Sequence, residues 1–382
     1  MDCYFDNSAT TRVSDRVFQV VKKTMLEDYG NPSSRHGKGV AAERYVKDAA
    51  QKIARTLKCS PKEILFTSGG TESDNLAIIG AALMRKGRGK HLITTAVEHP
   101  AVYKAMEFLE EQGFSYTVLP VDENGHVSPE DLEAALRPDT ILVSVMHVNN
   151  EIGAVEPVEV LSDVIKRKNP DTLFHVDAIQ SYGKYRIRPD RMGIDLLSVS
   201  GHKLHGPKGV GFLYIRNGVH LHPILFGGGQ QGGLRSGTIN VPGIAGMGEA
   251  AEEAYERFEE KVSRMQALKD RLTEGVLKLP EVRVNSKKGE ESAPHIVSIS
   301  VKGVRSEVLL HALEDRGISV SSGSACSSNH PGISGTLKGI GLPKELLDST
   351  IRVSLCPENT EEEADYFLGA FTELVPALRR FS

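Results

Sequence analysis

Short runs of apolar residues alternate with amphipathic stretches along most of the chain from about residue 60. The runs have strand length and end in polar or glycine-containing turns, whereas the stretches between them follow a helical period. Strands are predicted at 63–67, 91–95, 116–119, 140–146, 173–176, 196–199 and 210–215, and helices at 72–84, 101–111, 129–136 and 157–168. Such alternation predicts parallel strand–helix–strand units with helices on both faces of one sheet. In such folds, ligands bind beyond the carboxyl ends of the strands.

The pattern changes near residue 245. A long, charged amphipathic stretch at 249–279 predicts one or two helices. Further strands are predicted at 296–301, 318–320 and 351–355, and further helices at 306–316 and 360–380. The C-terminal third of the chain therefore predicts a second, smaller α+β domain.

Composition narrows the classes of function. The chain has 382 residues, of which 40% are hydrophobic and 25% charged, and its formal net charge is -4. These values are typical of a soluble globular protein and indicate no nucleic-acid or membrane-surface partner. We find no run long enough to span a membrane and no signal peptide at the N-terminus. Its four cysteines, Cys3, Cys59, Cys326 and Cys356, are scattered, which argues against a disulfide framework and favours the reducing cytoplasm.

Lys203 lies in a glycine-rich connection between two predicted strands, S-V-S-G-H-K-L-H-G-P-K-G-V-G at 198–211. A lysine confined in this way can hold its amine against a carbonyl cofactor and partly out of water, as a Schiff base requires. The alternative is a solvated loop lysine, and the upstream motifs described next favour the Schiff base. His202 and His205 form an H-x-x-H pair, but no cysteine or carboxylate cluster is near in the sequence, so we expect no resident metal.

Two upstream motifs supply partners for such a cofactor. Residues 64–75 read as a strand, a Gly-Gly turn and a helix start, where backbone N–H groups and the helix dipole favour a phosphate. Thr71 can cap this helix and also bind the anion. Asp177 ends a buried strand, where a carboxylate needs a partner such as a pyridinium nitrogen. The alternatives are a plain capped helix and a helix N-cap aspartate. Asp177 precedes Lys203 by 26 residues, which predicts one strand–helix–strand step and adjacent strands.

Four more residues carry candidate chemistry. His99 and Asn150 follow predicted strands, where a histidine can stack on a ring and move protons and an asparagine can donate to a phenolate oxygen. Both also suit ordinary polar loops. Cys326 lies in S-S-G-S-A-C-S-S-N, which predicts a flexible, exposed loop and favours a nucleophile, whereas Cys356 is predicted to pack. Arg352, in a strand, can clamp a carboxylate.

Taken together, these motifs resemble the cysteine desulfurases of the NifS/IscS type, which are pyridoxal-phosphate-dependent members of the class V aminotransferase superfamily. The resemblance runs from D-N-S-A-T-T at 6–11 to I-R-V-S-L at 351–355. Its most specific pieces are S-G-H-K-x-x-G-P-K-G, S-G-G-T-E-S-D-N and S-S-G-S-A-C. It implies the α/β fold-type I architecture. Residues 13–250 would form a large cofactor-binding domain with a mainly parallel sheet, and 1–12 with 251–382 a small α+β domain carrying the catalytic-cysteine loop.

The resemblance also implies roles for individual residues. Lys203 would carry pyridoxal 5'-phosphate, Asp177 would pair with the pyridinium nitrogen, and His99 would stack on the ring and assist proton transfer. Cys326 would accept the sulfur and could contact an iron–sulfur cargo transiently. The other implied contacts are Gln180 and Asn150 at the ring oxygen, Gly70, Thr71, Ser200 and His202 at the phosphate, Thr238 at the phosphate of a homodimer partner, and Arg352 and Asn7 at the substrate carboxylate.

The implied reaction converts L-cysteine to L-alanine and passes the sulfur, as a persulfide on Cys326, to an acceptor or iron–sulfur scaffold protein. The sulfur would serve iron–sulfur cluster, thio-cofactor or tRNA synthesis. The alternatives are a selenocysteine lyase, another class V lyase or aminotransferase, and a catalytically idle scaffold. A transaminase has no need of Cys326, and the intact set of functional residues disfavours the idle scaffold. The chain departs from many family members at Cys356-Pro357, where Gly or Ser is frequent.

Overall fold

The computed structural model describes residues 1–322 and 334–380. Its main sheet has the strand order β2-β8-β7-β6-β5-β3-β4 among these residues. The strands are β2 (Ile64–Thr67), β3 (His91–Thr95), β4 (Ser115–Leu119), β5 (Thr140–Met146), β6 (Leu173–Asp177), β7 (Leu196–Ser200) and β8 (Gly211–Ile215). All the predicted strands of this sheet are present, which confirms a mainly parallel α/β sheet.

One strand runs against the others. β8 pairs antiparallel with both β2 and β7, whereas β7, β6, β5, β3 and β4 form parallel pairs. Only ten residues separate the end of β7 at Ser200 from the start of β8 at Gly211. This connection lacks the crossover helix that usually joins parallel neighbours, and the chain simply turns back. The predicted parallel strand–helix–strand pattern therefore does not extend to β8, and the sheet is mainly parallel, as expected.

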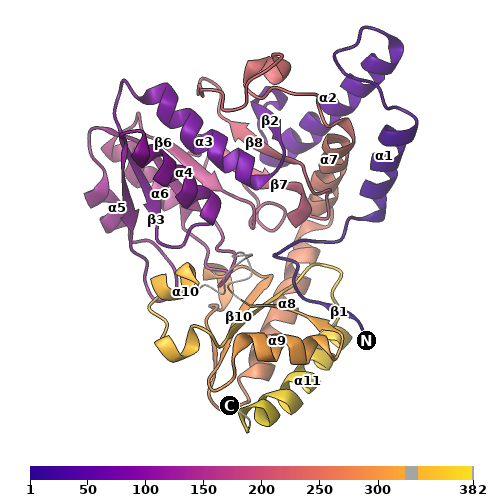
Figure 1. Cartoon of the computed structure of the whole chain (residues 1–382), viewed down its shortest axis with the longest axis vertical. Coiled ribbons are helices and arrows are strands. Elements are labelled where there is room, and N and C mark those ends of the chain that lie inside the picture. The colour runs from indigo at the N-terminus through magenta and orange to yellow at the C-terminus, as the bar shows by residue number, and fades with distance from the viewer. Residues whose placement is uncertain (323–333, 381–382) are drawn as a thin grey trace.

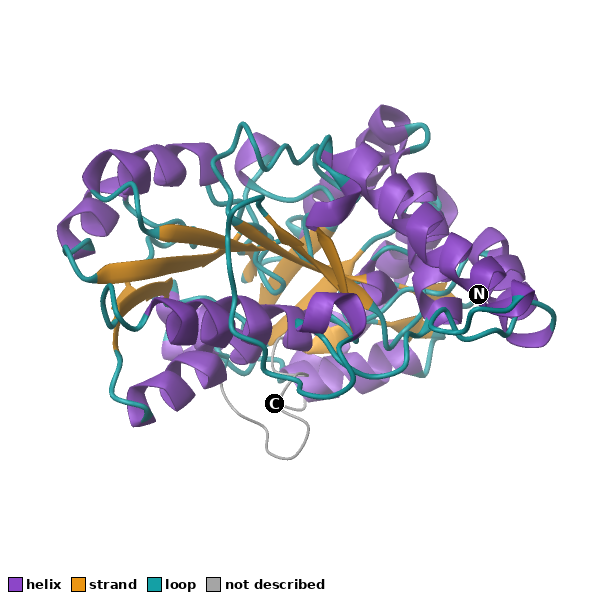
Figure 2. Ribbon diagram, turned by 90° about the horizontal axis from the view of Figure 1, so that it is seen from above, coloured by secondary structure: helices purple, strands orange, loops and turns teal. Residues whose placement is uncertain are grey.

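Helices cover both faces of the sheet (Figures 1 and 2). They are α1 (Asp15–Leu26), α2 (Gly37–Leu57), α3 (Gly70–Arg85), α4 (Pro100–Glu111), α5 (Pro129–Ala135), α6 (Val158–Lys168) and α7 (Val241–Tyr255). Successive residues of a strand point to opposite faces. Phe66 accordingly packs in a core with α2, α6 and α7, whereas its neighbour Leu65 packs in a second core with α3 and α4.

Two features of this layer differ from the sequence expectations. The hydrophobic pattern assigned no helix before residue 60, yet α1 and α2 occupy much of that segment. Phe18, Met25 and Leu26 of α1 are exposed, which blurs its amphipathic pattern. The predicted strand–helix–strand step between Asp177 and Lys203 is also wrong, because residues 178–195 form turns and no helix. β6 and β7 are nevertheless adjacent and parallel, as predicted.

A second sheet, of order β12-β13-β10-β9, organises the smaller part of the chain at the bottom of Figure 1. Its elements are α8 (Phe258–Val276), β9 (Val282–Val284), β10 (Ile296–Val301), α9 (Ser306–Glu314), β12 (Ser321–Ser322), α10 (Gly335–Gly339), β13 (Thr350–Ser354) and α11 (Glu361–Arg379). The long amphipathic stretch is two helices, α7 and α8, separated by Arg257 with a left-handed φ of 50°.

The N-terminal residues belong to this smaller part. β1 (Cys3–Tyr4) pairs in parallel with β11 (Ile318–Ser319), and Cys3 and Phe5 are buried in the core of the small sheet. Since each sheet has a core of its own, we propose the domain division 13–250 and 1–12 with 251–382. No helix within the described residues is long and apolar enough to cross a membrane.

Candidate active site

A cavity of about 260 Å³ gathers most of the predicted site residues. It lies where β2, β5, β6 and β7 end, with Arg352 of β13 completing its wall. This is the edge of the sheet at which the fold predicts ligand binding. The lining residues are Ser8, Ala9, Gly70, Thr71, His99, Met146, Asn150, Asp177, Ile179, Gln180, Ser200, His202, Lys203 and Arg352.

One end of the cavity is the N-terminus of α3. Gly69 precedes the helix with a φ of 150°, a conformation that L side chains rarely adopt, and a Cβ on Gly70 would collide with Ile179. No side chain caps this helix, so the expected capping role of Thr71 is not seen, and Thr71 instead lies exposed in the first turn. The first-turn N–H groups of a helix have no intrahelical acceptors, and together with Ser200 and His202 they suit an anion.

Lys203 ends a short helical turn, Gly201–Lys203, directly after β7. Its Nζ donates to the backbone carbonyls of Ser8 at 2.5 Å and Ala9 at 2.7 Å. The half-buried Lys184 donates to the carbonyl of Lys203 at 2.6 Å. Burial and the charge of Lys203 lower the pKa of Lys184 to about 8. The amine of Lys203 is therefore held at one wall of the cavity, as the sequence predicts.

Asp177 lies buried at the end of β6, and its Oδ1 accepts from the N–H of Ile179 at 2.9 Å. Burial raises the pKa of its carboxyl to about 6, although the nearby Lys203 acts in the opposite direction. Two further buried acids surround it. Burial, together with the charge of Asp177, raises the pKa of Asp74 well above its ordinary value, and burial raises that of Glu98 to about 8. This acidic cluster in a dry setting favours a cationic partner for Asp177.

His99 is held in a defined orientation as the N-cap of α4. Its Nδ1 accepts from the N–H of Ala101 at 3.1 Å, so that Nε2 carries the proton when the ring is neutral. Burial and the charge of Lys203 lower the pKa of His99, which keeps the imidazole neutral near pH 7. Burial likewise lowers the pKa of His202 to about 4, and the Nδ1 of His202 lies 3.2 Å from the Oγ1 of Thr10.

Arg352 brings the small domain into the cavity. One terminal nitrogen donates to the carbonyl of Asn150 at 2.8 Å and the other to the Oδ1 of Asp6 at 2.8 Å. Its Nε is buried and has no hydrogen-bond partner. An arginine held in place by two neighbours, with further N–H donors remaining, is suited to a carboxylate ligand.

Two of the described site residues, Asn7 and Thr238, do not line this cavity. The Asn7 amide donates to the carbonyls of Tyr4 and Ser354, each at 3.1 Å, and Asn7 does not line the cavity. Thr238 is exposed and also outside the cavity. Cys326 falls outside the described residues. Cys356 is buried, as predicted, and burial raises the pKa of its thiol to about 12.

Other functional neighbours were not identified from the sequence. Asp6, Ser8 and Ala9 lie within the D-N-S-A-T-T motif. Their position beside Asn7 in the sequence could have identified them as site residues. For Lys184 and His295 no such signal exists in the sequence, because only the tertiary structure brings them to the site. The His295 Nε2 lies 3.4 Å from the Oε1 of Gln180.

Comparison with known proteins agrees with this architecture. The aminotransferase class-V family model matches residues 3–367. The chain therefore belongs to the aminotransferase class-V family. It is 42% identical over 382 residues to the cysteine desulfurase IscS of Dictyoglomus turgidum, covering 100% of this chain and 96% of that protein. It is 43% identical over 379 residues to the cysteine desulfurase IscS of Methanosarcina thermophila, covering 99% and 93%.

Solved structures give the same result. A NifS-like protein superposes with a TM-score of 0.94 at 42% identity, covering 99% of this chain and 100% of the other. SspA in complex with cysteine superposes with a TM-score of 0.81 at 36% identity, covering 94% and 100%. The predicted resemblance to cysteine desulfurases of the NifS/IscS type is confirmed, as are the enzyme class and the fold.

Proposed function

We propose that this chain is a pyridoxal-phosphate-dependent cysteine desulfurase that releases L-alanine and transfers the sulfur through Cys326. One observation carries the proposal. A single cavity contains a positioned lysine, Lys203, a buried acid, Asp177, and an arginine, Arg352, that retains one unpartnered donor. These groups complement an aldehyde, a pyridinium and a carboxylate respectively.

The donor set fits pyridoxal phosphate. Asp177 is buried beside two other acids, so a protonated ring nitrogen would relieve a cluster that burial otherwise forces toward the neutral form. At the other end, the N-terminus of α3, with Ser200 and His202, offers donors to the phosphate. Gln180 and Asn150 would face the ring oxygen, and His99 would cover the ring. The cofactor, when bound, would act as an electron sink for charge that develops on the substrate.

The chain's own residues supply binding and proton movement. Arg352 binds the substrate carboxylate and places the α-carbon near Lys203, while Asp6 and Asn150 hold the guanidinium. Lys203 accepts the α-proton at Nζ, and the neutral His99 is placed to move protons near the substrate thiol. The buried wall of the cavity limits water access, which strengthens each of these interactions.

Sulfur leaves as a formal S⁰ atom. The Cys326 thiolate attacks the substrate sulfur, an S–S bond forms, and the substrate C–S bond breaks with its electron pair remaining on carbon. Protonation of that carbon skeleton yields L-alanine and leaves a persulfide on Cys326. An acceptor thiol or iron–sulfur scaffold protein then takes the sulfur, for iron–sulfur cluster, thio-cofactor or tRNA synthesis. The cytoplasm, which is reducing, suits these thiols, and we propose that location.

A homodimer forms part of the proposal. Thr238 is exposed. Leu225 and Phe226, which precede the glycine-rich segment 227–233 on the N-terminal side of Thr238, are 42% and 73% exposed. Large apolar side chains at that exposure suit a subunit contact. Thr238 would then reach the phosphate of the partner subunit.

The test incubates purified holoenzyme with L-cysteine and a reductant and quantifies alanine and sulfide together, with Cys326→Ala measured alongside. Equal yields of both products from the wild type and almost none from the variant are expected. If the variant were as active as the wild type, Cys326 would not carry the persulfide. If both proteins bound the cofactor and neither produced alanine, L-cysteine would not be the substrate. An aminotransferase would then be the favoured alternative.

A further inference from the structure

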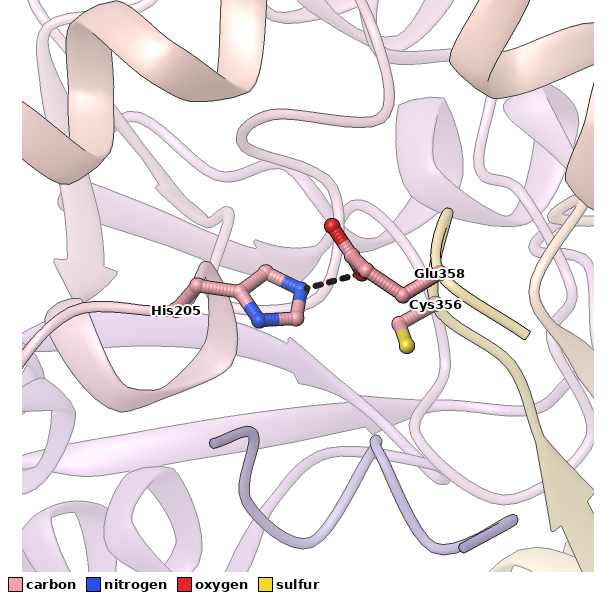
Figure 3. A group of neighbouring side chains, drawn as sticks. All are labelled: His205, Cys356 and Glu358. Atoms are coloured by element: carbon pink, nitrogen blue, oxygen red, sulfur yellow. Dashed lines mark ion pairs between the residues drawn. The ribbon is translucent and has the colours of Figure 1, made fainter. Parts of the chain in front are cut away.

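A second cavity shares Lys203 with the wall of the proposed active site. Its lining includes His205, Cys356, Glu358, Lys184 and His295. The proposed reaction assigns no role to His205, Cys356 or Glu358. His205 lies in the loop after β7, whereas the other two follow β13, so the group joins the main sheet to the small domain. Figure 3 shows their side chains gathered at one point.

The three residues offer an imidazole nitrogen, a thiol sulfur and a carboxylate oxygen within 4.8 Å of one another. The His205 Nε2 lies 3.3 Å from the Glu358 Oε2. Tetrahedral zinc with bonds of about 2.0–2.3 Å separates its ligand atoms by roughly 3.3–3.8 Å. The histidine–glutamate pair is already at that spacing, and the Cys356 sulfur lies within 4.8 Å of both of these atoms.

The imidazole is oriented as metal-binding histidines usually are. His205 Nδ1 lies 2.9 Å from the carbonyl of Arg12, so it donates its proton there and leaves the lone pair on Nε2. The His205 N–H donates to Thr11 Oγ1 at 2.7 Å, which holds the residue at a φ of 63°. A non-glycine residue fixed in this conformation is uncommon and concentrates at functional sites.

An independent observation also indicates a ligand in this cavity. His295, 1% exposed, lines the cavity, and its Nδ1 has no hydrogen-bond partner. A buried polar atom without a partner is costly, and a metal-bound water would supply one. Lys184, which also lines the cavity, directs its amine to the carbonyl of Lys203 at 2.6 Å.

We propose that His205, Cys356 and Glu358 bind a divalent cation of the zinc type, with water in the fourth position facing the cavity. The donor set of one sulfur, one nitrogen and one oxygen selects zinc or cobalt over magnesium or calcium. The bound ion links the loop that carries Lys203 to the segment that follows Arg352. Of the H-x-x-H pair in the sequence, for which we expected no resident metal, only His205 belongs to the proposed site.

The test measures Zn²⁺ retained by the holoenzyme after equilibrium dialysis. All variants are made in a protein that carries Cys326→Ser, the background protein, so that the thiol assigned to catalysis cannot bind Zn²⁺. About one equivalent per chain is expected, and it should be lost, with at least about 100-fold weaker affinity, in Cys356→Ser and His205→Asn. Asparagine tolerates the left-handed backbone at position 205. Cys59→Ser, which removes a half-buried cysteine elsewhere, is the matched control and should keep the ion.

Two readouts separate binding from damage to the fold. Co²⁺ in place of Zn²⁺ should give the visible absorption of tetrahedral cobalt with a thiolate ligand, absent in Cys356→Ser. Zn²⁺ at about a hundred times its dissociation constant should raise Tm by about 3 °C through preferential binding to the folded chain. Glu358→Gln changes an exposed side chain, so it should fold normally and still weaken binding. Equal affinity in Glu358→Gln, Cys356→Ser and the background protein, or no retained zinc in the background protein, overturns the site.

Discussion

Gly70→Ala tests the contact between the start of α3 and the cavity wall. A Cβ at position 70 would collide with Cδ1 of Ile179 and lie 3.1 Å from its Cγ1. Ile179 lines the cavity, so in the cofactor-free protein its side chain can rotate into open space. If the proposed cofactor fills that space, the collision must be accommodated by strain. We therefore expect the substitution to weaken cofactor binding more than it weakens the fold.

The size of the effect follows from the cost of overpacking. Inserting one methyl group into a packed site costs about 1–3 kcal/mol. At about 1.4 kcal/mol per tenfold, pyridoxal phosphate should bind about 5- to 150-fold more weakly if the whole cost falls on the bound state. Ile179→Val removes Cδ1, the atom in the collision, and by itself costs about 0.5–1.5 kcal/mol. The double variant should recover most of the lost affinity, with a coupling energy of about 1 kcal/mol or more.

The assay is titration of cofactor-depleted protein with pyridoxal phosphate, followed by absorbance, for the wild type, both single variants and the double variant. Gly37→Ala is the matched control: a Cβ there meets nothing within 4 Å, so affinity should not change. The reasoning would be refuted if Gly70→Ala bound the cofactor as tightly as the wild type. Additive effects in the double variant would show that Ile179 is not the group that collides.

Two further predictions concern stability. Burial raises the pKa of Glu98 from 4.5 to about 8. Between those pH values the folded chain binds one more proton than the unfolded chain, so stability falls as pH rises. Glu98→Gln should flatten that fall in urea unfolding from pH 5 to 8, and an unchanged slope would contradict the assignment. Leu272→Ala, at a fully buried position of α8, should lower the free energy of unfolding by about 2–5 kcal/mol. A loss below about 1 kcal/mol would show that this core repacks.

The sequence predicted the elements best where a segment carries its own signal. The buried strands of the main sheet are nearly continuous apolar runs, and Gly69 before α3 has a φ that L side chains rarely adopt. The unpredicted helix α1 shows the limit, because its exposed Phe18, Met25 and Leu26 conceal the face that packs on α7. The turns between Asp177 and Lys203 were likewise not predicted. Residues 178–195 connect two strands, a position where the pattern favoured a helix, but they form none.

Candidate site residues could be predicted from the sequence where one motif contains both the polar group and the local backbone that presents it. Lys203 in its glycine-rich turn and Asp177 at the end of a strand are of this kind. The partners of these groups depend on the tertiary structure. Asp6 meets Arg352 from 346 positions away, Ser8 meets Lys203 from 195, and Cys356 and Glu358 reach His205 only when the two domains pack. Local propensity acts over a few residues, whereas these contacts form only after strand order and domain packing have closed loops of hundreds of residues, so no local pattern encodes them.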